Sequence, residues 1–140
     1  MKSWKVPYFA FFWGSSLSHD EVNNPRIGDV VYLQSLESMS NRGYFDNTIV
    51  VLMSDHGIRF GPFRQTYQGG IEDRLPFLFI KVPKQFEKTY PLATANLKWN
   101  AEVLTTHFDL HETLLDISSP SRLTDQFIES GKGNQKAELA

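Results

Sequence analysis

The chain alternates between short apolar runs that carry no charge and polar segments rich in serine, asparagine and glycine. The run Thr48–Met53 follows the turn pair Asp46-Asn47 and ends abruptly at the segment Ser54–Gly57. A short β-branched run without alternation is typical of a strand buried on both faces, as in the middle of an α/β sheet. We therefore predict a strand here, with an aspartate and a histidine side by side just after its carboxyl end.

The preceding pattern predicts a strand and a helix. Val6–Trp13 is aromatic and uncharged, which favours a second buried strand, and apolar residues at threefold and fourfold spacing predict a helix over Asp29–Met39 that stops near Gly43. Strand, helix and strand then form a βαβ unit, whose right-handed crossover places both strand ends at one edge of the sheet. We expect the loops that hold His19 and His56 to open on the same face, as ligand sites of open α/β sheets do.

The pattern after the Asp-His pair is less regular. Ile58–Glu72 contains three glycines and a proline, which indicates an extended loop. Thr106 and Asp109 have the spacing of a capping box and open a predicted helix over Phe108–Ile117. A third strand over Leu75–Val82 and a short helix over Asn96–Leu104 are also predicted. From Ser118 onward apolar residues become sparse, so we divide the chain into an α/β domain (residues 1–117) and a polar, partly disordered tail (residues 118–140).

Composition narrows the classes of function. A chain of 140 residues can form one compact domain, and 16 acidic against 14 basic residues give a net charge of -2. This balance offers no electrostatic case for binding nucleic acid or an anionic membrane surface. The absence of cysteine excludes disulfides, thiolate zinc sites and a cysteine nucleophile. No apolar run approaches the roughly 20 residues that a membrane-spanning helix needs.

The candidate chemistry lies in the two polar loops. Asp55 and His56 are both capable of binding metal, and the alternative is that Asp55 caps a turn beside a polar histidine. His19 is followed by Asp20, which we expect to cap or orient its loop. Arg64 is either an anion contact or one half of a surface salt bridge.

Other polar residues are interpreted as structural. His107 and His111 have helical spacing, but no glutamate of an H-E-x-x-H motif lies between them, so we interpret both as ordinary helix residues. Glu72 and Arg74 are expected to pair with each other. The serines at positions 15, 16 and 18 have no identified base to activate them as nucleophiles.

Three segments in order resemble a known family. The stretches FFWGSSLSHDEVN, DNTIVVLMSDHGIRFG and NLKWNAEVLTTHFDLHETLLDI are similar to the C-terminal half of the sulfatase-like branch of the alkaline phosphatase superfamily. Within it they most resemble the animal family named domain of unknown function 229. The resemblance covers Val6 to Ile117. It implies an α/β fold in which this chain forms the C-terminal portion of a sulfatase-like sheet, with helices on its faces.

The resemblance also implies a chemistry. Asp55 and His56 match the residues that bind a divalent metal ion, which would be zinc, manganese or calcium. His19 matches a histidine that contacts the sulfuryl or phosphoryl oxygens of the substrate, and Arg64 is a looser match to a basic residue. The implied reaction is hydrolysis or transfer of a sulfate or phosphate ester, in which a metal polarises the ester oxygen. Surrounding cations and imidazoles stabilise the developing charge.

The chain also departs from that pattern. Members carry an upstream half with a first acidic metal ligand and a nucleophile, and this sequence lacks a match to it, so we expect an incomplete sheet and a fragment that is inactive alone. Two functions stay open: part of a metal-dependent ester hydrolase, or a non-catalytic remnant that serves as a binding or structural module. The resemblance implies the secretory route or the extracellular space. Substrate and metal identity are left open.

Overall fold

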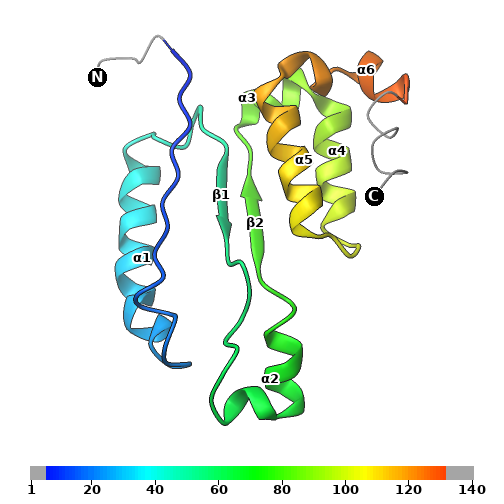
Figure 1. Cartoon of the computed structure of the whole chain (residues 1–140). Helices are drawn as coiled ribbons and strands as arrows, with labels where there is room; N and C mark the ends of the chain where they lie inside the picture. Colours follow the sequence, from blue (N-terminus) through cyan, green and yellow to red (C-terminus); the bar gives the residue numbers. More distant parts are fainter. Residues whose placement is uncertain (1–5, 132–140) are drawn as a thin grey trace. The chain divides into compact units, whose positions relative to one another are not determined.

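The computed structural model describes residues 6–131 and forms two compact units that are interleaved along the chain. The first unit consists of residues 1–38 and 56–76, and the second of residues 39–55 and 77–140. In chain order the elements are α1 (Pro25–Asn41), β1 (Val50–Met53), η1 (Phe63–Gln65), α2 (Tyr67–Glu72), β2 (Leu78–Lys81), α3 (Lys84–Thr89), α4 (Pro91–Asn100), α5 (His107–Ser118), η2 (Pro120–Leu123) and α6 (Asp125–Glu129) (Figure 1).

The strands β1 and β2 form an antiparallel ladder in the second unit. Val50 lies opposite Lys81 and Met53 opposite Leu78, and the Ser54 N–H donates to the Phe77 carbonyl at 3.1 Å, one step beyond the ladder. Both strands lie inside the predicted apolar runs and are shorter than those runs. Helices with a small sheet are compatible with the α/β class.

The predicted strand over Val6–Trp13 is wrong. The segment has no regular secondary structure, and its large apolar side chains are 60–90% exposed. A strand is stabilised by ladder partners and by burial of its faces, and in the described residues this segment joins no ladder and keeps its large side chains exposed. Because the first strand is missing, the predicted βαβ unit is also wrong, and the argument for a shared sheet edge loses its premise.

The helix α1 and its stop are confirmed. The helix begins earlier than predicted, at Pro25, where the fixed φ of proline and its missing N–H suit the first turn. It ends with a left-handed residue, Gly43, at φ +75°. The Gly43 N–H donates to the Ser40 carbonyl at 2.9 Å and the Tyr44 N–H to the Met39 carbonyl at 3.0 Å, which is the Schellman pattern.

The predicted helix around residues 108–117 is confirmed as α5. The Thr106 N–H and the Thr106 hydroxyl both donate to Asp109 Oδ2 at 2.7 Å, so the predicted capping-box pair is in contact. The pKa of Asp109 is lowered, first by the hydrogen bond from the Thr106 side chain and then by that from its backbone. The helix predicted over Asn96–Leu104 overlaps α4, which begins earlier, at Pro91, and also ends earlier, at Asn100.

The second unit has a small apolar core, and the segment after Ser118 contributes to it. Its buried apolar side chains are Phe45, Ala93, Leu110 and Leu123. Leu123 belongs to η2, so the chain between residues 118 and 131 is more ordered than its sparse apolar residues indicated, whereas residues 132–140 lie outside the described part. Within residues 6–131 no helix has the length and apolar character to cross a membrane.

The predicted extended loop over Ile58–Glu72 is wrong in its second half, which folds into η1 and α2. Thr66 lies at the N-cap of α2 and its hydroxyl oxygen accepts the Gly69 N–H at 3.0 Å. Gly69 is buried against η1, and a Cβ on it would lie far inside the contact distance of the Phe63 carbonyl oxygen. Glycine therefore allows a close backbone approach here, where the sequence pattern indicated flexibility.

Candidate functional site

Asp55 and His56 lie in the loop directly after β1, as predicted. The hydrogen bond from Ser54 to Phe77 holds the backbone up to the residue before the pair. Asp55 is exposed, and His56 is partly buried. An acid and an imidazole are thus presented at the end of an ordered strand.

The ring of His56 has a defined tautomer. Its Nδ1 lies 2.6 Å from the carbonyl oxygen of Gly57. A carbonyl oxygen only accepts hydrogen bonds, so Nδ1 carries the proton and Nε2 carries the lone pair of the neutral ring. A histidine whose Nδ1–H donates to a backbone carbonyl is the usual arrangement of a ligand that binds metal through Nε2.

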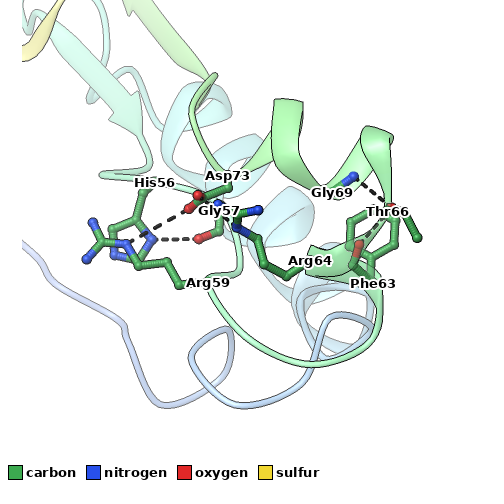
Figure 2. Close-up of polar contacts among 8 residues, drawn as sticks. All are labelled: His56, Gly57, Arg59, Phe63, Arg64, Thr66, Gly69 and Asp73. Atoms are coloured by element: carbon green, nitrogen blue, oxygen red, sulfur yellow. Dashed lines mark hydrogen bonds and ion pairs between the residues drawn. The ribbon is translucent and has the colours of Figure 1, made fainter.

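Gly57 fixes the course of the loop behind His56. Its N–H donates to the Asp73 carbonyl oxygen at 3.2 Å (Figure 2). A Cβ on Gly57 would lie far inside the contact distance of the Glu72 carbonyl oxygen and 2.9 Å from the Asp73 Cα. Only glycine permits this approach, which ties the loop after β1 to the end of α2.

Asp73 joins the loop to two arginines. Its Oδ2 lies 3.0 Å from Arg64 Nε, its Oδ1 lies 4.0 Å from Arg59 Nε, and its side chain is only 13% exposed (Figure 2). Arg64 is therefore half of a salt bridge, the second of the two roles considered for it. Glu72 accepts a hydrogen bond from Gln68 Nε2 at 2.8 Å, and its predicted pairing with Arg74 is not found among the ion pairs of the described residues.

The sequence interpretation missed Asp73. It lies next to Glu72 and Arg74 and has no distinguishing spacing, so its partners follow only from the fold of η1 and α2. A chain of contacts now runs from Arg64 to Asp73, from Asp73 to Gly57, and from Gly57 to His56. The structure thereby connects two predicted site residues, His56 and Arg64, through one chain of contacts.

His19 lies in the loop before α1, in the first unit. Its Nδ1 is 2.6 Å from Asp20 Oδ1, and its ring centroid is 5.6 Å from that of Phe60. Phe60 follows His56 by four residues, so the loop after β1 reaches the histidine loop. Asp20 contacts His19, which agrees with the expectation that it orients this loop.

No complete metal site is formed within the described chain. Among residues 6–131, no three or more histidine, cysteine, aspartate or glutamate side chains are grouped so that they could hold a metal ion. His111 Nδ1 lies 3.4 Å from Glu112 Oε1 on α5, which fits an ordinary helix residue. Asp55 and His56 are thus two candidate ligands of a site that needs others.

A hollow of about 200 Å³ lies in the second unit, between α3, α4, α5, η2 and α6. At its wall Arg122 Nη2 lies 2.8 Å from Asp116 Oδ1, a close ion pair whose geometry is not that of a hydrogen bond. Burial raises the pKa of Asp116, and the charge of Arg122 acts in the opposite direction. The sequence interpretation did not identify this hollow, because its lining comes from five separate elements.

Comparison with known proteins gives one family. The model of the family described as "Protein of unknown function (DUF229)" matches residues 1–138. The searches of curated proteins and of solved structures gave no match. The family match spans all the candidate site residues.

Proposed function

We propose that this chain, which belongs to the DUF229 family, is the metal-binding part of a hydrolase that acts on sulfate or phosphate esters. The observation that carries the proposal is the His56 ring, whose Nδ1 lies 2.6 Å from the Gly57 carbonyl while Asp55 precedes it at the end of β1. The carboxylate and the imidazole fit zinc or manganese, whereas calcium, the third ion considered, prefers oxygen ligands. The superfamily relationship to sulfatases, and with it a secretory or extracellular location, belongs to this proposal.

A bound ion would polarise an ester oxygen and stabilise charge on the group being transferred. Each candidate residue of this chain has one role in that arrangement. Asp55 and His56 hold the ion, His19 meets the anionic oxygens of the ester, and Asp73 with Gly57 keeps the His56 loop in place. Arg64 is in contact with Asp73, so any role in anion binding would require it to serve both groups.

Metal titration tests the first part of the proposal. Two protein ligands are fewer than the three or four of known zinc sites, so we expect weak binding of zinc and manganese by calorimetry, reduced in Asp55→Ala and in His56→Ala. His107→Ala is the matched control and should bind as the parent does. Submicromolar binding that survives Asp55→Ala would contradict the proposed ligands.

A non-catalytic module is the second candidate. It is favoured by the use of Arg64 as a structural partner of Asp73, since a residue held in a salt bridge is accounted for without any substrate. This hypothesis predicts that the chain folds as described and does not turn over sulfate or phosphate esters.

An assay with aryl sulfate and aryl phosphate can overturn the non-catalytic candidate. We expect no turnover at an enzymatic rate by the chain alone, because no activated nucleophile is identified and a misplacement of about 1 Å can cost on the order of a hundredfold. Turnover that is lost in both Asp55→Asn and His56→Ala would overturn the non-catalytic candidate and place a nucleophile within these residues.

A further inference from the structure

The loop Ser15–Asp20 is an ordered turn. The N–H groups of Ser18 and His19 both donate to the Ser15 carbonyl, at 3.1 and 2.9 Å. Two hydrogen bonds to one carbonyl fix the backbone of the residue that carries the His19 ring. The His19 ring is therefore carried by an ordered backbone.

The turn is anchored on α1 by Leu17. Gly28 is buried in α1, and a Cβ at that position would lie 2.5 Å from Leu17 Cδ2 and 2.9 Å from Tyr32 Cε2. The absence of a side chain on Gly28 makes the space that Leu17 occupies. The histidine is thus connected to a helix through the neighbouring side chains of its own loop.

Two contacts fix the ring of His19. Asp20 Oδ1 is 2.6 Å from Nδ1, and the Phe60 ring lies tilted by 59° at a centroid distance of 5.6 Å. His19 and Asp20 are 63% and 80% exposed, so the ion pair contributes little to overall stability. The ion pair instead determines which ring nitrogen carries the proton. A carboxylate that accepts a hydrogen bond from Nδ1 selects the tautomer that is protonated at Nδ1.

We propose that Asp20 is a positioning residue, which holds the His19 ring with Nδ1–H toward its carboxylate and turns Nε2 outward as the atom that meets a ligand. The ligand part rests on the proposed function. In the neutral ring Nε2 accepts a hydrogen bond from a hydroxyl or water. In the protonated ring Nε2–H donates to a sulfate or phosphate oxygen while Asp20 faces the other N–H.

Imidazole nitrogen spectra of the full chain test the ring orientation without any assay of activity. With ¹⁵N-labelled histidine at about pH 8.5, where an ordinary histidine is neutral, we expect His19 to show a protonated Nδ1 and an unprotonated Nε2. Its signals are assigned by their loss in His19→Gln. Asp20→Ala should replace this single-tautomer signature by a mixture, whereas Asp20→Asn, whose amide oxygen still accepts, should retain it.

The chain supplies a matched control. His111 also precedes an acid, but its Nδ1 lies 3.4 Å from Glu112 Oε1, outside the range of a good hydrogen bond. Glu112→Ala should therefore leave the signals of His111 unchanged, and unchanged His56 signals in Asp20→Ala show that the first unit is folded. A His19 signature that is the same in Asp20→Ala and the parent would overturn the proposal, as would a protonated Nε2 in the parent.

Titration with inorganic sulfate and inorganic phosphate tests the ligand part separately. At about pH 6, where an ordinary histidine is largely protonated, we expect the His19 Nε2 signal to shift on addition of either anion, and the shift to fall in Asp20→Ala. If the parent chain shows the expected tautomer but its His19 Nε2 signal does not shift with either anion, the result counts against the proposed function. The positioning role of Asp20 is not affected by that result. A shift of equal size in Asp20→Ala would overturn that role.

Discussion

The two units are built in different ways. Among the described residues, the buried positions of the first unit are two glycines, Gly28 and Gly69, whereas the second unit buries apolar side chains such as Phe45, Leu110 and Leu123. The first unit depends on close approach of backbone to its neighbours and on the Asp73 ion pairs. The second depends on packing of helices around a small core.

The difference indicates what each unit can tolerate. In the second unit, removing methyl groups should be the damaging change, because it leaves a cavity. In the first unit, adding a single methyl group at a buried glycine should be damaging, because it forces backbone apart. The candidate site residues His19, His56 and Arg64 all belong to the first unit. Close backbone contacts and ion pairs therefore hold these residues in place more than an apolar core does.

The largest effect is expected from Leu110→Ala. Leu110 is 8% exposed on α5, and its truncation should lower the free energy of unfolding of the second unit by about 2–4 kcal/mol. Leu115→Ala, at a position on the same helix that is 37% exposed, should cost much less. Urea unfolding followed by circular dichroism measures both variants. Equal losses would contradict the proposed core.

Gly69→Ala should have the next largest effect. The added Cβ collides with the Phe63 backbone, and separating η1 from α2 should cost about 1–3 kcal/mol. Gly70→Ala is the matched control, because its Cβ would meet only Arg64 Nη1 at 3.6 Å, and alanine favours a helix. Hydrogen exchange of the α2 amides measures the difference between the two variants. Similar protection in both would contradict the claim that the first unit depends on close backbone approach at Gly69.

Asp73→Asn should have a smaller effect. It removes the charge that faces Arg64 at 3.0 Å in a half-buried pair, and we expect a loss of about 1 kcal/mol with greater mobility of the Arg64 side chain. Glu72→Gln changes the neighbouring exposed acid and should be nearly neutral. The Nε–H signal of Arg64 reports the change. If that signal moves equally in both variants, Asp73 is not the residue that holds Arg64.

The smallest effect concerns the two ends of α5. The pKa of Asp109 is lowered below 3.8 by its hydrogen bonds from Thr106, so its contribution to stability is present above pH 3.8 and is lost as the pH falls through the lowered value. The pKa of Asp116 is raised by burial, so its contribution is present below pH 3.8 and is lost as the pH rises through the raised value.

Urea midpoints measured across the acid range check these signs. Asp109→Asn should weaken the loss of stability on acidification, and Asp116→Asn should strengthen it. A steeper acid loss in Asp109→Asn would show that the Thr106 contacts do not favour its charged form.

Features encoded by neighbouring residues were predictable. The end of α1 follows from Gly43, the start of α5 from Thr106 and Asp109, and the Asp-His pair after β1 from the sharp end of an apolar run. The two helix ends depend on hydrogen bonds and backbone preferences within about one helical turn, whereas β1 also needs its partner strand β2. Such short-range information is complete in the sequence pattern, and the structure confirms it.

Other features depend on contacts between distant segments. The aromatic run Val6–Trp13 has the composition of a strand, but a strand also needs a neighbour to accept its hydrogen bonds, and composition does not supply one. The glycines of Ile58–Glu72 indicated a loop, while Gly69 serves to let α2 approach η1. The partners of Asp73 likewise arise only when residues 57, 64 and 73 meet, because ion pairs and close backbone approach are properties of the folded chain and not of any local pattern.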